Sequence, residues 1–321
     1  MQIYFWGSRG SLPASLTGKM VKAKIVKAIH ASLSHQLKSD EAIEAFIQQE
    51  LPFSVRESYG GNTSCIEIRG QDEYILCDAG SGLRDFGNYF MKSIKRQPGS
   101  SSSVFHLFIS HLHWDHIQGF PFFIPAYIPD HRINIYGYHP DLEMAFINQQ
   151  NNSYFPVALK DMKADILFHV LELEKNYDIG GFTVKGMKQN HPGDSYGYCF
   201  MKEGKKIVYS TDAEHKEDAE DEKYVFLDFC RNADLLIFDA QYIMLDAIHT
   251  KENWGHSSNL IGVELALKAG VKRLCLFHNE HTNDDEALDQ FLDDTRKYLK
   301  IQTGSYPLKI DLAYDGLEIE I

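Results

Sequence analysis

Four side chains that could bind metal ions lie within six residues of one another, in the sequence His111-Leu-His113-Trp-Asp115-His116. The mostly apolar stretch 104–110 before them predicts a buried strand that ends at this motif. Residues two apart on an extended chain point the same way, so His111 and His113 could bind one ion together. Asp115 and His116 follow where the chain is expected to turn into a helix, so they would face a second point. The motif therefore predicts neighbouring sites for two ions.

Three further candidate ligands, His191, Asp212 and His278, stand at or just after the ends of other predicted strands. With the motif they complete two groups, which are His111, His113 and His191 for one ion, and Asp115, His116 and His278 for the other. Asp212 could bridge both ions. Imidazole and carboxylate donors without a thiolate favour zinc, although Mn²⁺ or Fe²⁺ could use the same donors. We therefore expect two Zn²⁺ ions as the cofactor.

The remaining sequence predicts the scaffold that would bring these strand ends together. Strands are predicted in both halves of the chain and helices follow them, which favours two packed sheets with helices outside. No repeat, linker or change of composition divides residues 1–321, so we expect a single domain. Residues 13–56 interrupt a hairpin-like start with two predicted helices, Gly18–Leu37 and Asp40–Glu50, the second with Ser39 as its N-cap. This helical insertion could be a packed surface decoration, a lid over the site or a dimer contact.

The net charge of −13 limits the partners that the protein could bind. A long polyanion held mainly by Lys and Arg would meet a repulsive mean field, so extended nucleic acid is disfavoured. A local basic pocket for a small anion remains compatible with this charge. The 44% hydrophobic and 24% charged content are those of a soluble globular protein.

The cysteines and the N-terminus indicate the compartment. Five scattered cysteines with no CxxC pair fit reduced thiols in a cytoplasmic protein. The N-terminus has no basic region followed by an apolar run, so no signal peptide is predicted. The most apolar stretch, 120–129, is short and contains three prolines, so no membrane span is predicted.

The motif, followed in order by His191, Asp212 and His278, resembles the metallo-β-lactamase superfamily over essentially the whole chain. Three segments are most similar to its ribonuclease Z and cyclic-phosphate phosphodiesterase branch, namely 191–198 (HPGDSYGY), 209–212 (YSTD) and 255–258 (GHSS). The resemblance implies a four-layer αββα sandwich with two zinc ions at one edge of the sheets. The turn 7–13 and the segment 60–64 also resemble the opening of that branch, where they are normally nearly adjacent. Here the insertion separates them, which is a departure.

The resemblance also implies roles for three residues outside the ligand set. Asp78 matches an early aspartate that accepts the free N–H of a ligating imidazole, although it could instead cap a turn. His256, in Gly-His-Ser-Ser, matches a general acid. In the family a carboxylate at a strand end keeps this histidine protonated, and Asp239 stands at that position. The branch carries Glu there, so the shorter Asp puts the pairing distance in doubt. His256 could alternatively cap the following helix or lie buried.

These residues predict hydrolysis of a phosphodiester. Two ions about 3.5–4 Å apart could hold a bridging hydroxide as the nucleophile, because zinc lowers the pKa of bound water to about 7. The catalytic residues would then be Asp115, His256 and Asp239, and the leaving alkoxide would take its proton from His256. The alternatives to phosphodiester hydrolysis are hydrolysis of a thioester, a lactone or another ester.

Four further residues could contact the substrate. Arg9, in a Gly-flanked turn, could contact a phosphate, and His215 and His281 flank ligand positions. Phe122 could stack on a base together with its aromatic neighbours Phe120, Phe123 and Tyr127, although aromatics this dense usually belong to a core. Arg9, His215 and His281 could instead be ordinary surface side chains that contact only solvent.

A small phosphodiester, most simply a cyclic nucleotide, fits the acidic charge best. The alternatives are a ribonuclease Z-like enzyme that processes RNA or tRNA 3′ ends, and a non-catalytic protein that binds metal or nucleotide. The stretch 138–190 contains no Gly- and Lys-rich arm of the kind that the resemblance associates with tRNA binding. Related enzymes are often dimers, so a homodimer is compatible with the resemblance, but the sequence itself does not determine the oligomeric state.

Overall fold

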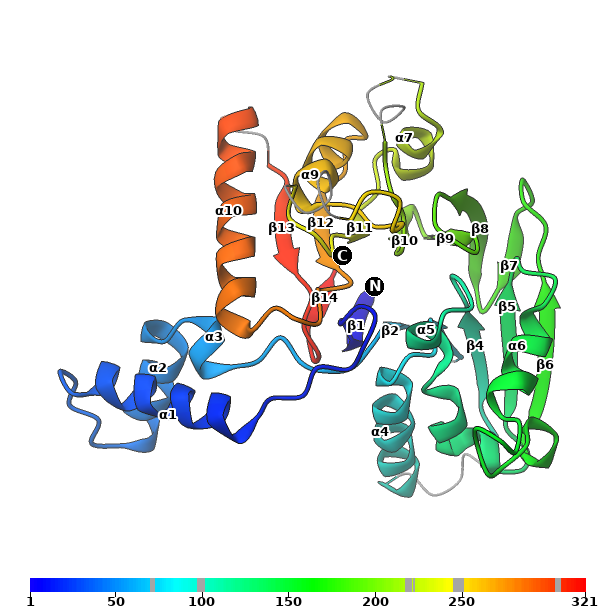
Figure 1. The fold of residues 1–321 in the computed structure, drawn as a ribbon, viewed down its shortest axis with the longest axis horizontal. Helices are drawn as coiled ribbons and strands as arrows, with labels where there is room; N and C mark the ends of the chain where they lie inside the picture. The colour runs from blue at the N-terminus through cyan, green and yellow to red at the C-terminus, as the bar shows by residue number, and fades with distance from the viewer. Residues whose placement is uncertain (70–72, 97–101, 217–220, 222, 245–250, 304–306) are drawn as a thin grey trace.

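The computed structural model describes residues 1–321 except 70–72, 97–101, 217–220, 222, 245–250 and 304–306. Within the described residues the strands form two sheets of seven (Figure 1). In order across the first sheet these are β14 (Glu318–Glu320), β1 (Gln2–Gly7), β2 (Cys65–Arg69), β3 (Tyr74–Cys77), β4 (Val104–Phe108), β5 (Arg132–Gly137) and β6 (Asp165–Val170). The second sheet runs β13 (Lys309–Leu312), β12 (Arg273–Phe277), β11 (Leu235–Asp239), β10 (Lys205–Ser210), β9 (Ser195–Lys202), β8 (Phe182–Gln189) and β7 (Tyr177–Ile179).

Each sheet is half antiparallel and half parallel. Pairing is antiparallel from β14 to β3 and parallel from β3 to β6. In the second sheet it is antiparallel from β7 to β10 and parallel from β10 to β13. Parallel strands place their carboxyl ends at one edge, so each sheet can offer several strand-end side chains to the same site.

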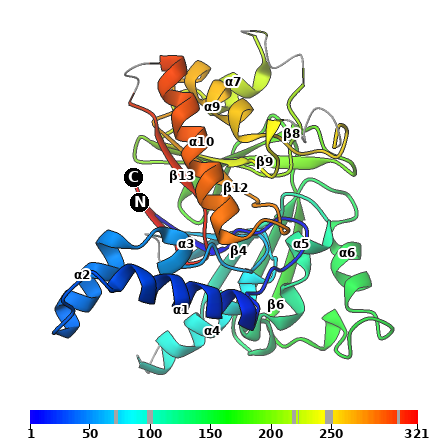
Figure 2. The ribbon, with the colours of Figure 1, turned by 60° about the vertical axis from the view of Figure 1, so that its left-hand side comes forward.

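The core lies between the sheets, with a second apolar layer on each outer face. Fully buried Phe5 and Phe108 of the first sheet belong to the same cluster as Phe200 and Phe277 of the second. On the outer face of the first sheet pack α4 (Gly82–Arg96), α6 (Leu142–Gln149) and the 3₁₀ turns η1 (Phe120–Phe122), η2 (Ile124–Tyr127) and η3 (Leu159–Asp161). On that of the second pack α7 (Val225–Cys230), α9 (Asn259–Lys268) and α10 (Asp285–Thr303). Figure 2 shows these helices on opposite sides of the sandwich, which is the predicted four-layer αββα arrangement.

The insertion forms α1 (Gly18–Ser32), α2 (Asp40–Glu50) and the short α3 (Phe53–Arg56), between the antiparallel strands β1 and β2. Ser39 caps α2 as predicted, and its hydroxyl accepts from the backbone N–H of Ala42. The predicted first helix is too long, because it ends at Ser32 rather than at Leu37. The ammonium of Lys24 binds the carboxylate of Asp285, so α1 is tied to the start of α10.

Several elements were not predicted from the sequence. They include the short edge strands β7, β13 and β14, the helix α4, and α3 as a third helix of the insertion. All five cysteines are buried and free. Among the described residues, no helix combines the length and the apolar character needed to cross a bilayer.

The turn at Gly60 and the residues after β1 are both bound to Asp315, near the C-terminus. Asp315 accepts hydrogen bonds from the backbone N–H groups of Ser8 (3.1 Å), Gly61 (2.9 Å) and Asn62 (2.9 Å). Gly60 has a φ of +83°, and an added Cβ would lie 2.1 Å from Cγ of Asp315. Only glycine meets both requirements.

Gly60→Ala should therefore lower the free energy of unfolding by about 3 kcal/mol or more, through left-handed backbone strain and overpacking together. The matched control is Gly204→Ala, whose φ is +75° but whose Cβ would have no neighbour within 4 Å. This control should cost only about 1–2 kcal/mol. Urea unfolding measures both, and equal losses would show that contact with Asp315 is not the constraint.

Candidate active site

The candidate site lies where strands of both sheets end. His111, Asp78 and Asp212 follow β4, β3 and β10, and His278 directly follows β12. Three of these residues have left-handed backbone, with φ of 60° at Asp78, 50° at Asp212 and 63° at His278. This conformation costs about 1–2 kcal/mol for a residue with a Cβ, and such outliers concentrate at functional sites.

The first predicted ligand group is brought together. His111, His113 and His191 offer nitrogen atoms that lie within 4.8 Å of one another. Nε2 of His191 is 3.1 Å from Nδ1 of His113, and the His111 and His191 rings are 4.8 Å apart. His113 is exposed, whereas His111 and His191 are buried. The group is therefore open to solvent on the His113 side.

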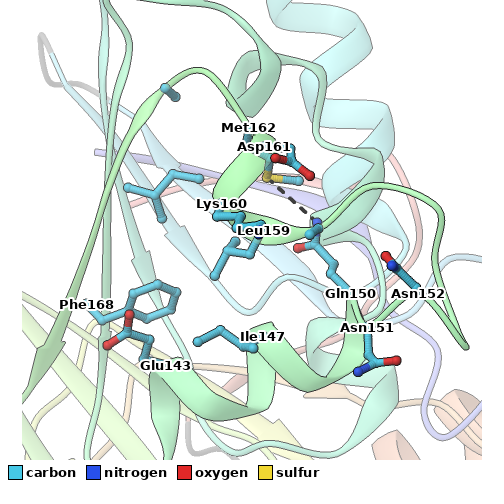
Figure 3. A pocket seen from close by; sticks show the side chains of 13 residues that line it. Glu143, Ile147, Gln150, Asn151, Asn152, Leu159, Lys160, Asp161, Met162 and Phe168 are labelled. Carbon is cyan, nitrogen blue, oxygen red and sulfur yellow. Dashed lines mark hydrogen bonds between the residues drawn. The ribbon is translucent and has the colours of Figure 1, made fainter.

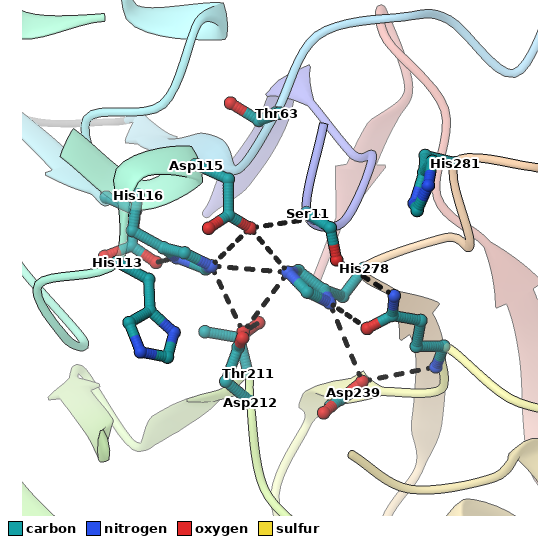
Figure 4. Close-up of polar contacts among 12 residues, drawn as sticks. Ser11, Thr63, His113, Asp115, His116, Thr211, Asp212, Asp239, His278 and His281 are labelled. Atoms are coloured by element: carbon teal, nitrogen blue, oxygen red, sulfur yellow. Dashed lines mark hydrogen bonds and ion pairs between the residues drawn. The ribbon is translucent and has the colours of Figure 1, made fainter. Parts of the chain in front are cut away.

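The second predicted group is also brought together, and it is more deeply buried. Oδ2 of Asp115 is 3.1 Å from Nε2 of His116 and 3.1 Å from Nε2 of His278 (Figure 4). The Nε2 atoms of these two histidines lie 3.3 Å apart. The backbone N–H of Ser11 donates to the same Asp115 oxygen at 2.9 Å. The N-terminal turn thus forms one wall of this group.

Asp212 lies between the two groups, as the sequence predicts for a bridging ligand. Its Oδ1 is 3.3 Å from Nε2 of His116 and 3.4 Å from Nε2 of His278. Its Oδ2 is 3.5 Å from Nε2 of His111 and 3.9 Å from Nε2 of His191. One oxygen therefore faces each group.

The other nitrogens of the buried imidazoles have fixed partners. Nδ1 of His116 donates to Asp78 at 2.7 Å, which is the contact predicted for Asp78. Nδ1 of His191 donates to the carbonyl oxygen of Gly255 at 2.8 Å, and Nδ1 of His278 to Oε1 of Gln241 at 3.2 Å. These contacts leave each Nε2 free to bind a cation. The contacts of Gln241 and Gly255 could not be predicted, because these residues are far in sequence from the histidines that they contact.

The donor set fits divalent cations. Nε2 of His111 is buried with no hydrogen-bond partner among the described residues. Burial lowers the pKa of His111 well below its usual range, and also lowers the pKa of His113 and His191, so these imidazoles are neutral donors. Burial would lower the pKa of His116 as well, but the carboxylates of Asp115, Asp212 and Asp78 raise it well above its usual range. The second group therefore attracts positive charge.

His256 and Asp239 form a pair beside these groups. Nδ1 of His256 is 2.9 Å from Oδ2 of Asp239, so the shorter Asp reaches the imidazole. The His256 ring stacks on the His278 ring with centroids 5.0 Å apart. Burial lowers the pKa of His256, but the Asp239 carboxylate, with Asp212 and Asp115, raises it to about 9.

Two of the predicted substrate contacts do not fit the structure. Arg9 is 3% exposed, and its guanidinium donates to the backbone oxygens of Gly60, Glu280 and Asn283, so it holds loops together instead of facing a substrate. His215 is buried, with its ring stacked on Phe238, and burial lowers its pKa to about 4.

The other two predicted contacts remain accessible. His281 is about one-third exposed, with its Nδ1 3.1 Å from Glu280. Phe122 is half exposed and packs edge-on against Phe155. Phe120 and Phe123 are core residues, as expected for aromatics this dense, and the phenol of Tyr127 donates to the backbone carbonyl of Pro121, so these neighbours form no stacking wall with Phe122.

A separate pocket of 760 Å³ lies between α6, β6 and the loop that joins them (Figure 3). Ile147, Leu159, Met162 and Phe168 supply much of its apolar wall, and the amide of buried Gln150 donates to the carbonyl oxygen of Val157 beside it. None of the candidate ligands lines this pocket, so it is not part of the candidate site.

Known sequences resemble the chain over most of its length. A family profile described as "Beta-lactamase superfamily domain" matches residues 73–279. A curated ribonuclease Z of Picrophilus torridus is 28% identical in an alignment of 281 positions that covers 70% of this chain and 82% of the relative. A ribonuclease Z of Brevibacillus brevis is 26% identical in an alignment of 267 positions that covers 66% of this chain and 79% of the relative.

Solved structures share the fold at lower identity. The metallo-beta-lactamase fold protein YhfI of Bacillus subtilis has a TM-score of 0.63 at 19% identity, covering 100% of this chain and 98% of its own. The short form of human tRNase Z has a TM-score of 0.57 at 18% identity, covering 100% of this chain and 99% of its own. With the profile match over residues 73–279, these findings show that the chain belongs to the beta-lactamase superfamily, as a ribonuclease Z-like member with the metallo-beta-lactamase fold.

Proposed function

We propose that this protein is a metal-dependent phosphodiesterase that cleaves RNA, with the two ligand groups and the His256–Asp239 pair as its active site. The observation that carries the proposal is the convergence of the other six candidate ligands, from both sheets, around Asp212. RNA is favoured over the cyclic nucleotide expected from the sequence because the curated relatives matched over most of their length carry the name ribonuclease Z.

His111, His113 and His191 would hold one divalent cation, and Asp115, His116 and His278 the other, with Asp212 between them. When bound, the two cations would supply Lewis acidity to ionise a water and to neutralise the phosphate. Asp78, Gly255 and Gln241 would fix the orientation of the imidazoles through the contacts described above. Asp115 is held in turn by the Ser11 backbone.

His256 would donate the proton that the leaving oxygen needs. Its Nδ1–H is engaged by Asp239, so Nε2 carries the proton available for transfer. The second oxygen of Asp239 accepts from the backbone N–H of Gln241 at 3.2 Å, and Oδ2 also accepts from that of Ala213 at 3.0 Å. These contacts fix the carboxylate and therefore the orientation of the imidazole.

A small phosphodiester such as a cyclic nucleotide is the second candidate substrate. The net charge of −13 opposes a long polyanion. Residues 138–190, which the structure describes throughout, fold into α6, η3, β6, β7 and β8 and form no separate protruding arm. A non-catalytic binding protein is the third, and turnover of any phosphodiester excludes it.

Metal analysis tests the ligand assignment. The protein reconstituted with Zn²⁺ should hold two ions per chain by inductively coupled plasma mass spectrometry, and Asp212→Ala should lose at least one of them because it removes an oxygen from each group. Asp234→Asn is the matched control, since this carboxylate pairs with Lys272 at the opposite end of β11 and should leave the metal content unchanged. Asp212→Ala with two tightly held ions would contradict the bridging role.

The role of His256 can be separated from that of a ligand. His256→Ala should lower kcat about 10²-fold or more while both ions stay bound, because only the proton donor is lost. Loss of an ion would instead make His256 a ligand. His30→Ala, on an exposed face of α1, is the control and should keep parental kcat.

The pH profile of Asp239→Asn tests the pair itself. The donor must be protonated, so kcat falls as pH rises through the pKa of His256, which the Asp239 carboxylate raises. Removing that charge should move the alkaline limb to lower pH, by about one unit or more. An alkaline limb that stays in place would reject the assignment of Asp239.

A substrate panel decides between RNA and small phosphodiesters. The Zn²⁺-loaded protein should hydrolyse bis-p-nitrophenyl phosphate and should trim a 3′-extended tRNA with a higher kcat/KM than 3′,5′-cyclic nucleotides. The reverse order would establish the small-substrate candidate. Full metal loading without turnover of any of them would favour the binding protein.

A further inference from the structure

The two exposed tryptophans of this chain both stand next to the candidate active site. Of three tryptophans, Trp6 is 8% exposed and packs against Phe86 in the core. Trp114 is 82% exposed and Trp254 is 59% exposed. Trp114 lies between the candidate ligands His113 and Asp115, and Trp254 is two residues before His256. Each ring therefore offers a large aromatic surface to a ligand beside the candidate ligand groups.

A short chain of contacts joins the two tryptophans across the first ligand group. His113, which precedes Trp114, has its Nδ1 3.1 Å from Nε2 of His191. Nδ1 of His191 in turn donates to the carbonyl oxygen of Gly255, which follows Trp254, at 2.8 Å. The backbone positions of Trp114 and Trp254 therefore lie on either side of the first ligand group, whose His113 is exposed.

The backbone at both tryptophans is fixed although the rings are exposed. Trp114 begins the helical turn α5 (Trp114–Ile117), and its carbonyl oxygen accepts from the backbone N–H of Gln118 at 2.7 Å. Trp254 closes a turn through its N–H to the carbonyl oxygen of Lys251 at 3.2 Å. The Lys251 ammonium lies 5.9 Å from the Trp254 ring and is bound by Glu280. Rings on a fixed backbone bind at low cost in entropy.

We propose that Trp114 and Trp254 are substrate-binding residues that stack on the nucleobases either side of the scissile phosphodiester. The inference rests on the proposed function, and it names nucleobases as the class of ligand. Base stacking on an aromatic ring contributes about 1–3 kcal/mol per base and tolerates any base sequence. It needs no positive charge, so it suits a protein whose net charge of −13 weakens attraction to phosphates.

Single variants of both residues test the inference in the Zn²⁺-loaded protein. Trp114→Ala and Trp254→Ala should each lower kcat/KM for the better nucleotide substrate about 5- to 100-fold, mainly through KM, with unchanged metal content. Trp114→Phe and Trp254→Phe should recover most of the loss, because a ring is retained. The control is Tyr89→Ala, which removes a half-exposed ring two turns along α4 and should leave kcat/KM unchanged.

Tryptophan fluorescence gives a readout that does not need turnover. Adenosine 5′-monophosphate should quench the emission of the parent protein, and each alanine variant should lose part of this quenching. Alanine variants with parental KM and parental quenching would overturn the inference, as would phenylalanine variants no better than alanine. If bis-p-nitrophenyl phosphate and nucleotides are not hydrolysed at all, the proposed function fails. The quenching experiment would then still decide whether the tryptophans bind bases.

Discussion

The candidate site depends on the interactions of the Asp212 carboxylate with the imidazoles around it. Its two oxygens lie 3.3 to 3.9 Å from nitrogen atoms of five imidazoles, which belong to His111, His116, His191, His256 and His278. A buried carboxylate surrounded in this way is stable only where positive charge, from protons or cations, balances it. Burial opposes ionisation of Asp212, but the imidazoles of His278 and His116 hold its pKa well below the usual range.

The αββα fold can meet this requirement because it brings the carboxyl ends of strands from both sheets to one edge. β4 and β12 lie in different sheets, and they deliver His111 and His278 to opposite sides of Asp212. The left-handed backbone at Asp78, Asp212 and His278 turns these side chains inward directly after their strands. The strain is offset by fixed contacts, such as those that Asp78 accepts from Ser110 at 2.7 Å and from the phenol of Tyr209 at 2.6 Å.

Much of the fold and the ligand set could be predicted because the signals are local. The two-residue spacing of His111 and His113 needs only an extended backbone, and Asp212 and His278 stand at strand ends that apolar runs mark clearly. The contacts of Gln241, Gly255 and Tyr209 could not be predicted, since each depends on which strand lies beside which. The short strands β13 and β14 lack a long apolar run, and only their partners β12 and β1 define them.

Side-chain direction was the other limit of sequence analysis. The aromatic residues after the metal motif are equally apolar, but 3₁₀ turns direct Phe120 and Phe123 into the core and Phe122 toward solvent. In the same way, an arginine in a Gly-flanked turn near the site could bind a substrate phosphate or could bind groups of the protein itself. Arg9 has the structural role, because its guanidinium donates to three backbone carbonyls.

The distribution of charge constrains how a nucleic acid could be recognised. Two lysines of the insertion, Lys24 and Lys27, are paired with Asp285 and Glu286 of α10, so they attach α1 to the body instead of attracting phosphate. Arg9 is likewise occupied, and Lys251, beside the site, is bound by Glu280. Because these four cations are paired within the protein, an RNA substrate would gain little affinity from them and would be bound mainly by the site itself and by uncharged surface around it. The acidic charge is then compatible with an RNA substrate that is bound near the scissile bond and not along a basic groove.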